Sequence, residues 1–286
     1  MLICDLLNKY NIEKYHVDGL IINSYEYSCF TQPTFKVDEL EEVVNLVKRV
    51  NKKVFISADR IIEEFEVDDF YKYLNYLNTL GIDYLIFSDL CVLDYCQHND
   101  YCFKLLFDSK TMITNKYDAM IYKDMNVDVM IANELTIEDM IKISEAGNTC
   151  LEIYGYHQIF YSRRRIFDSY NQYNHDNYPY SNKKFNLQEE FRSEFYPIYQ
   201  NQYGTFVYSS SRFMMMTELS DFENIKLFKI NGNFIEENEL LDILDIYSQA
   251  LNGGNLEELE KQLLSINDNI TKGFLHNKSI LLKGEE

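Results

Sequence analysis

Stretches of strand length that are apolar at nearly every position recur along this chain. Strands buried on both faces give such continuous runs, and they occur where helices cover a parallel sheet. Eight units of this kind within about 250 residues favour an α/β closed barrel, a (β/α)8 TIM-like fold, over an open doubly wound sheet. The runs span residues 19–25, 54–58, 83–89, 104–108, 128–134, 150–154, 205–210 and 226–232.

Amphipathic stretches separate most of these runs. Residues 37–50 repeat apolar side chains at a helical period. A second helix is predicted to end at Gly81, and another to begin with a capping box between Thr136 and Asp139. No glycine-rich phosphate-binding motif follows the first run, which argues against a nucleotide-binding alternative. The predicted helices are 37–50, 68–81, 117–125, 136–147 and 236–251.

Residues 171–202 interrupt this alternation of apolar runs and amphipathic stretches, because they are polar and aromatic. A long connection inside a barrel is usually a lid or a binding loop, and a mobile surface loop without function is the alternative. We expect the segment to lie across the carboxyl ends of the strands. The sequence thus predicts one barrel domain, residues 1–251, with this insertion, followed by a polar, peripheral tail at 252–286.

Charge and composition limit the classes of function. The net charge of −19 argues against a broad phosphate-binding surface, although it leaves room for a local basic patch. No apolar run approaches the ~20 residues of a membrane span, and no signal peptide is recognised, so a cytoplasmic protein without membrane contact is expected. The six cysteines form no disulfide framework, which predicts reduced, buried thiols.

Polar side chains gather at the ends of the predicted strands, where a barrel carries its chemistry. Glu152 lies inside an apolar run, and a buried carboxylate requires a partner or a function. An ion pair with an arginine and a catalytic role both fit this position. An arginine cluster follows at 163–165, so we expect Glu152 and Arg164 to line one pocket with Glu134 nearby. The candidates are Asn23, Asp59, Asp89, Asp108, Glu134, Glu152, Ser162, Arg164, Ser210, Arg212 and Asn231.

Known metal and nucleophile motifs are missing from the sequence. The five histidines show no HExxH or other paired spacing, and the spacing of Cys91, Cys96 and Cys102 is not that of a zinc or iron–sulfur site. There is no GxSxG nucleophile elbow. A thiol–imidazole pair of Cys150 and His157 is less plausible than packing, because Cys150 opens a buried strand. The sequence therefore predicts no bound metal and no complete catalytic constellation.

Several short segments follow one another in a familiar order. DSKTMITN at 108–115 resembles a strand end of the form STQ-T-x-x-N, and ANELTIEDM at 132–140 resembles RELS-x-EE. LEIYG…FYSRR resembles the signature E-V-x-x-HG-x-x-C-x-x-x-SG-x-C, and KLFKINGNF resembles LKIEGR. Over residues 19–251 this order is similar to peptidase family U32, the collagenase-like proteases that also include bacterial tRNA-hydroxylation proteins.

The cysteines of that signature are missing here. Its histidine falls at Tyr154, its two cysteines fall at Gln158 and Arg165, and a later cysteine falls near Met214. Members of the family that carry an iron–sulfur cluster hold it with such cysteines. We therefore predict no cluster and no other cofactor.

The resemblance implies two unlike activities, formation of 5-hydroxyuridine at the tRNA wobble position and a collagenase-type peptidase activity. The lost family positions add a third hypothesis, a non-catalytic scaffold or binding module. We favour tRNA hydroxylation with a partner, either a longer paralogue or a second copy of this chain, because the acidic surface opposes unaided tRNA binding. The assigned residues are Glu134 and Glu152 as catalytic and Ser162, Arg164, Arg212 and Lys229 as substrate-binding.

Overall fold

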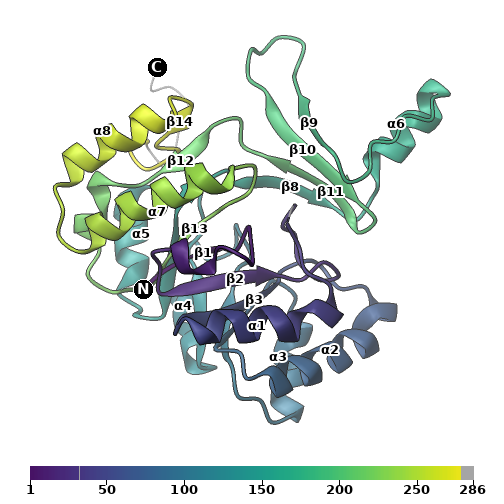
Figure 1. Cartoon of the computed structure of the whole chain (residues 1–286), viewed down its shortest axis with the longest axis horizontal. Coiled ribbons are helices and arrows are strands. Elements are labelled where there is room, and N and C mark those ends of the chain that lie inside the picture. Colours follow the sequence, from purple (N-terminus) through teal and green to yellow (C-terminus); the bar gives the residue numbers. More distant parts are fainter. Residues whose placement is uncertain (32, 278–286) are drawn as a thin grey trace.

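A closed barrel of parallel strands forms the centre of the molecule (Figure 1). The computed structural model describes residues 1–31 and 33–277, and in this part of the chain eight parallel strands pair in the order β13-β1-β2-β3-β4-β5-β6-β7, with β13 also pairing with β7. The predicted TIM-like (β/α)8 fold is confirmed. The barrel strands are β1 (Leu2–Asp5), β2 (Gly19–Asn23), β3 (Lys53–Ala58), β4 (Tyr84–Phe87), β5 (Lys104–Phe107), β6 (Val127–Met130), β7 (Thr149–Gly155) and β13 (Ile225–Ile230).

Two apolar layers explain the continuous apolar runs. One cluster draws side chains from all eight barrel strands, among them Ile3, Phe55 and Leu227, and fills the barrel interior. The alternate strand residues, such as Leu20 and Ile22, pack outward against the helices. The covering helices are α1 (Leu40–Arg49), α2 (Val67–Leu80), α3 (Cys91–His98), α4 (Lys116–Asp124), α5 (Ile137–Ser144) and α7 (Glu237–Leu251), with 3-10 turns η1 (Ile12–Lys14), η2 (Val37–Glu39), η3 (Glu64–Glu66) and η4 (Thr217–Asp221).

The five predicted helices are present, and their ends follow the local signals. Gly81 adopts a left-handed conformation (φ 60°) that terminates α2, and the Thr136 side chain accepts a hydrogen bond from the backbone N–H of Asp139 at the start of α5. Helix α3 was not predicted, because its eight residues follow a strand without a clear helical period. No helix in the described ranges combines the length and apolarity that a membrane crossing requires.

The count of eight barrel strands was correct, but one member was wrong. The run 205–210 overlaps β11 (Gly204–Tyr208), which pairs antiparallel in a separate sheet. It is buried along its whole length, and so it resembles a barrel strand in sequence. The missing barrel strand is β1, which was overlooked because it has four residues and is followed by the short turn η1 instead of an α-helix.

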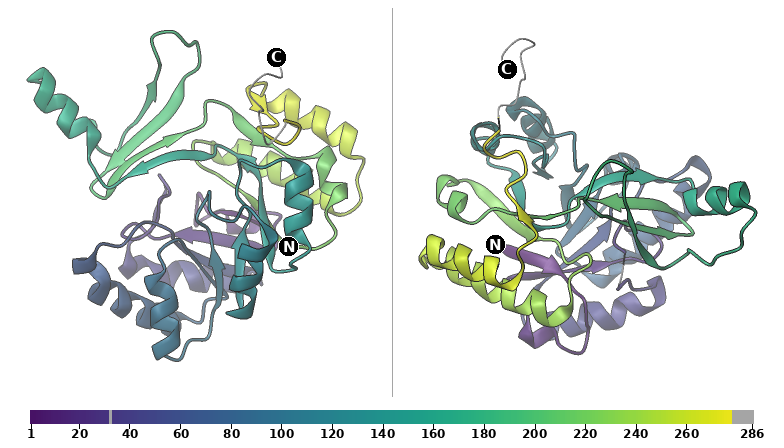
Figure 2. Two further views of the ribbon diagram at one scale, coloured as in Figure 1. Left: turned by 180° about the vertical axis from the view of Figure 1, so that it is seen from behind. Right: turned by 90° about the horizontal axis from the view of Figure 1, so that it is seen from above.

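A second sheet projects from the barrel between β7 and β13 (Figures 1 and 2). We call residues 158–208 the lobe. Its strands pair antiparallel in the order β8-β11-β10-β9, and the chain returns through β12 (Arg212–Met214), antiparallel to β7. The lobe contains β8 (Gln158–Ser162), α6 (Ile166–Asn174), β9 (Lys184–Leu187), β10 (Tyr196–Asn201) and β11.

Only part of the lobe reaches the barrel mouth. Gln158 of β8 and Tyr208 of β11 line the pocket at the carboxyl ends of the barrel strands. Helix α6 and the hairpin of β9 and β10 extend outward from the barrel (Figure 1). The polar, aromatic character of 171–202 therefore belongs mainly to a projecting sheet and helix.

The chain after α7 continues as an ordered strap over the barrel. It forms α8 (Leu256–Ile266) and β14 (Ile270–Thr271), and β14 pairs parallel with β12. Leu259, Leu263 and Leu275 are buried. The last part of the predicted tail, residues 278–286, lies outside the described residues.

Candidate functional site

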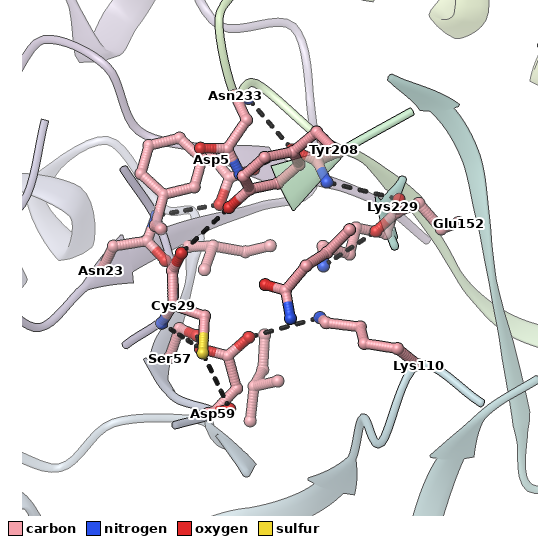
Figure 3. A pocket seen from close by; sticks show the side chains of 15 residues that line it. Asp5, Asn23, Cys29, Ser57, Asp59, Lys110, Glu152, Tyr208, Lys229 and Asn233 are labelled. Carbon is pink, nitrogen blue, oxygen red and sulfur yellow. Dashed lines mark hydrogen bonds and ion pairs between the residues drawn. The ribbon is translucent and has the colours of Figure 1, made fainter. Parts of the chain in front are cut away.

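The carboxyl ends of the barrel strands enclose a small polar pocket (Figure 3). Asp5 and Asn23 end β1 and β2, and Ser57 lies near the end of β3. Glu152 and Lys229 come from the neighbouring strands β7 and β13. The enclosed space is about 20 Å³, enough for one water molecule. The wall is completed by Ile21, Cys29, Phe30, Asp59, Ile86, Lys110, Gln158, Tyr208, Asn231 and Asn233.

Two lysines join three carboxylates into a buried network. The Nζ of Lys229 lies 3.0 Å from Oε2 of Glu152 and 3.3 Å from Oδ2 of Asp108. The Nζ of Lys110 lies 2.5 Å from the same Asp108 oxygen and 3.3 Å from Oδ2 of Asp59. Asp108 is 1% exposed and Glu152 is 4% exposed. Removal of one partner would leave a buried charge without compensation, so each member depends on the others.

The electrostatic environment shifts the pKa values of two carboxylates in opposite directions. Burial favours the neutral form of Asp108, but Lys110 and Lys229 outweigh it and hold the pKa of this carboxyl well below its ordinary value. Burial and the repulsion of Lys110 act to lower the pKa of Lys229. The carboxylates of Glu152 and Asp108 outweigh them and raise this pKa. In contrast, burial raises the pKa of Asp5 despite the attraction of Lys229. The ion network beside the pocket thus holds a firmly ionised carboxylate, Asp108, and the pocket wall holds one, Asp5, that gains a proton more readily.

Amide donors fix the orientation of two pocket carboxylates. The side chain of Asn23 and the backbone N–H of Gly232 each donate to Asp5 at 2.9 Å. The side chain of Asn231 donates to Oε1 of Glu152 at 3.3 Å. These donors leave Glu152 held between an ammonium group and an amide at the barrel mouth.

A histidine lies behind Glu152. The Nε2 of His157 is 3.6 Å from Oε1 of Glu152, and within the described ranges it has no hydrogen-bond partner. Its ring packs on Phe213, with the ring centroids 4.6 Å apart. Burial lowers the pKa of His157, which favours the neutral imidazole.

Two of the six assigned site residues meet in this pocket. Glu152 and Lys229 are register partners on β7 and β13, and their charged groups are in contact. Most other strand-end candidates also gather here. Those that line the pocket or join its ion network are Asn23, Asp59, Asp108 and Asn231.

The lobe carries two assigned residues away from the pocket. Ser162 ends β8, and its hydroxyl accepts a hydrogen bond from the backbone N–H of Arg164. The side chain of Arg164 is exposed and forms no ion pair with Glu152. The expected contact is therefore not formed, because β8 leaves the barrel in an antiparallel sheet. The cation that meets Glu152 is Lys229.

The two remaining assigned residues lie outside the pocket walls. Glu134 is exposed in the turn after β6. Arg212 is buried on β12 and forms an ion pair with Glu239 of α7. Of the other candidates, Asp89 accepts hydrogen bonds from the backbone N–H groups of Ile62 and Cys91, which is a local structural role.

Several pocket residues were not among the sequence candidates. Asp5 follows three apolar residues and is the end of the overlooked β1. Lys110 follows the predicted strand 104–108 by two residues, so its position was available as a signal. Gln158 and Tyr208 come from the lobe, and no local pattern indicates that they approach the barrel mouth.

The side chains at the family cysteine positions do not fit an iron–sulfur cluster. Gln158, Arg165 and Met214 supply no thiolate there. The pocket thiol, Cys29, donates to the carbonyl oxygen of Asp59 at 3.3 Å, and burial raises its pKa well above the ordinary value. Within residues 1–31 and 33–277, no group of three or more His, Cys, Asp or Glu side chains is arranged to hold a metal ion. The absence of a cofactor stays a prediction.

Comparisons with known proteins agree with this architecture. The model of peptidase family U32 matches residues 12–281. The tRNA hydroxylation protein P2 of Bacillus subtilis (strain 168) is 23% identical over 242 residues, which span 82% of this chain and 78% of that protein. The solved structure of the U32 peptidase Mk0906 has a TM-score of 0.52 at 14% identity, covers 80% of this chain and 91% of its own, and shares the fold. This chain belongs to peptidase family U32.

Proposed function

We propose that this protein takes part in hydroxylation of the wobble uridine of tRNA, together with a partner protein. The likeness to tRNA hydroxylation protein P2, which covers most of both chains, carries the proposal. The partner is a longer paralogue or a second copy of this chain. The collagenase-type peptidase has less support, because the pocket thiol of Cys29 is buried and its raised pKa opposes a nucleophilic thiolate.

The chemistry of the pocket suits a uracil ring. Uracil presents an N–H donor between two carbonyl acceptors, and the pocket offers a carboxylate acceptor in Glu152 beside an ammonium donor in Lys229. The present space holds one water molecule, so entry of a base requires side chains of the pocket wall to move aside. In this proposal Glu152 is catalytic and Lys229 binds the substrate.

Hydroxylation of a carbon atom is a two-electron oxidation. Carboxylates and ammonium groups bind, orient and transfer protons, and another component then supplies the oxidising equivalent. This division of labour favours a protein that works with a partner. Glu134, Ser162, Arg164 and Arg212 do not line the pocket, so the proposal assigns no catalytic step to Glu134 and no pocket contact to the other three. Arg164 is exposed and is available to the remainder of the RNA, whereas Arg212 is buried and paired with Glu239.

Nucleoside mass spectrometry of tRNA from a strain lacking the gene tests the proposal. We expect 5-hydroxyuridine derivatives to fall, to return with the wild-type gene and not to return with Glu152→Gln. Glu218→Gln is a matched control, because Glu218 is also a buried glutamate paired with a lysine but does not line the pocket. Thermal melting of both variants separates loss of function from loss of fold.

Two outcomes would replace the proposal. Unchanged tRNA together with cleavage of gelatin by the purified protein would favour the peptidase. Unchanged tRNA without proteolysis would favour a non-catalytic scaffold or binding module.

A further inference from the structure

The outer face of the lobe exposes tyrosines beside basic side chains. Tyr170, Tyr173 and Tyr178 are 53%, 83% and 46% exposed. Large exposed aromatic side chains grouped on one element mark an interaction surface more often than single ones do. We define the outer lobe patch as Arg164, Arg165, Tyr170, Tyr173, Tyr178 and Lys183.

Ring contacts join several members of this patch. Tyr180 lies with its ring centroid 4.7 Å from that of Tyr178 and 6.2 Å from that of Tyr170. The Nζ of Lys183 lies 5.3 Å from the Tyr178 ring centroid. Tyr173 follows Tyr170 by three residues on α6, so both side chains share one side of the helix. Aromatic faces and a cation therefore adjoin on one surface.

The basic side chains differ in whether they already form ion pairs within the protein. Arg163 is bound to Glu63 and Glu66 of the barrel, and Arg165 pairs locally with Asp168. Arg164 and Lys183 form no ion pair within the described residues. Their charges are available to an external anion.

Charge is divided unevenly along the chain. Residues 158–187 carry five Lys or Arg against two Asp or Glu, a net charge of +3, which leaves −22 for the other residues. A polyanion is repelled by the barrel and attracted to this part of the lobe. The hairpin tip at 188–195 has the opposite balance, with three glutamates and one arginine. The complementary surface is thus α6 and its flanks rather than the tip.

We propose that the outer lobe patch binds unpaired nucleotides of RNA, with bases stacked on Tyr170, Tyr173 and Tyr178 and phosphates bound by Arg164 and Lys183. Aromatic faces interleaved with cations form the usual platform for single-stranded nucleic acid. Strand β8 runs from Gln158 in the wall of the barrel pocket to Ser162, shortly before α6, so the patch lies on the same lobe that borders the pocket. The proposal rests on the proposed function for the identity of the RNA as tRNA.

Fluorescence anisotropy with the full chain tests the patch directly. The probes are a labelled single-stranded 12-nucleotide RNA containing uridine, the same RNA as a duplex, and a tRNA anticodon stem–loop. We expect wild-type protein to bind the single strand and the stem–loop more tightly than the duplex, because stacking requires unpaired bases. Tyr170→Ala with Tyr173→Ala should weaken binding by about tenfold or more.

A charge variant supplies an independent signal. Arg164→Ala with Lys183→Ala should lower the dependence of log affinity on log salt by roughly 0.7 for each lost phosphate contact. Matched controls are Phe191→Ala on the acidic hairpin tip (94% exposed), Tyr117→Ala on α4 (77% exposed) and Arg49→Ala on α1. The controls should bind RNA as the wild type does, and melting curves of all variants should coincide.

Other results would overturn the proposal. RNA binding that is absent in the wild type, or equal in the patch variants and the controls, removes the RNA surface. Patch variants that keep RNA binding but lose self-association in sedimentation would identify a protein-docking face instead.

If the deletion strain loses 5-hydroxyuridine while patch variants restore it and bind RNA normally, the inference fails and the proposed function stands. If RNA binding depends on the patch while tRNA modification is unchanged in the deletion strain, the RNA surface stands and the proposed function fails.

Discussion

At the scale of single residues, the pocket is a set of charges that require one another. Lys229 contacts Glu152 and Asp108, and Lys110 contacts Asp108 and Asp59. Buried ion pairs contribute little net stability compared with apolar packing, but loss of one member is costly. Such a network is retained for the arrangement that it creates, which here is a fixed carboxylate at the barrel mouth.

We predict that Asp108→Asn lowers the free energy of unfolding at pH 7 by about 3–5 kcal/mol, because two buried ammonium groups lose their shared partner. The pKa of Asp108 is depressed in the folded state, so its contribution is full above the ordinary value of 3.8 and is lost as the pH falls below it. Urea denaturation at pH 7 and pH 3 should therefore show a smaller difference from wild type at the lower pH.

Asp5→Asn is the matched comparison, because the pKa of Asp5 is shifted in the opposite direction to that of Asp108. Burial raises the pKa of Asp5, so the ionised form opposes folding at neutral pH, and its share of stability declines as the pH rises above 3.8. An asparagine at this position still offers an acceptor to Gly232 or Asn23. We expect a smaller cost at pH 7 than for Asp108→Asn. Equal costs with the same pH trend would contradict this account.

At the scale of elements, the strap formed by α8 and β14 is part of the folded core. Leu259 and Leu263 are buried against it, and Glu218 of η4 accepts hydrogen bonds from Lys272 at 2.9 Å and from His276 at 2.9 Å. A polar composition conceals these few apolar positions. Helix α8 therefore adds packing to the barrel despite its surface position.

We predict that Leu263→Ala lowers the free energy of unfolding by about 2–5 kcal/mol, because it removes a fully buried side chain and leaves a cavity. Leu264→Ala is the control, since that neighbouring side chain is 43% exposed, and it should change stability by about 0.5 kcal/mol or less. Urea denaturation of both variants measures the difference. Equal effects would mean that α8 does not pack as described.

The junction of β7 with the lobe requires a glycine for a steric reason. Gly155 has φ of 122°, and a Cβ there would lie 2.4 Å from the backbone oxygen of Asn231 and 2.7 Å from its Cβ. Asn231 donates to Glu152, so the same contact links backbone geometry to the pocket. Residue 155 thus needs both an unusual backbone conformation and the absence of a side chain.

We predict that Gly155→Ala is more destabilising than Gly253→Ala, whose φ of 89° is also positive but whose surroundings are open. The control isolates backbone strain, which costs about 1–3 kcal/mol, from the steric clash at Asn231. Gly155→Ala should also lose activity in the tRNA assay, because Asn231 shifts. Thermal melting and nucleoside analysis of both variants test the two effects, and equal melting temperatures would exclude the clash.

At the scale of the whole molecule, arginine contacts hold the lobe to the barrel. Arg163, directly after β8, contacts Glu63 and Glu66 at the turn η3, at 3.1 and 3.2 Å. Arg60 pairs with Glu66 and lies over the ring of Tyr203 in the lobe, 4.6 Å from its centroid. The lobe is therefore positioned by charge contacts and ring packing, whereas the barrel is closed by strand pairing.

Hydrogen–deuterium exchange should report this difference. We expect the slowest exchange in barrel strands such as β2 and β3, and faster exchange in α6 and β9, which carry few buried side chains. Arg163→Ala should accelerate exchange in the lobe but not in the barrel. Arg192→Ala is the control, because Arg192 pairs locally with Glu189 on the hairpin tip. Acceleration throughout the chain would show that lobe and barrel unfold as one unit.

Local sequence was sufficient for much of the fold. The apolar runs identify seven of the eight barrel strands, because a strand that is buried on both faces is apolar at nearly every position. The capping signals at Gly81 and Thr136 locate helix ends, because they act within a few residues. Glu152 is recognisable as a site residue because a carboxylate within an apolar run is costly unless it is paired.

Which side chains meet at the pocket depends on contacts between distant parts of the chain. Glu152 and Lys229 are partners through the register of β7 with β13, which closes the barrel between segments far apart in sequence. Arg164 is nearer in sequence, but the antiparallel direction of β8 carries it onto the lobe. Most barrel strands, the five predicted helices and the buried carboxylate follow from local sequence, since these depend on local burial patterns. Strand register and lobe direction determined its partner, because long-range pairing leaves no local pattern.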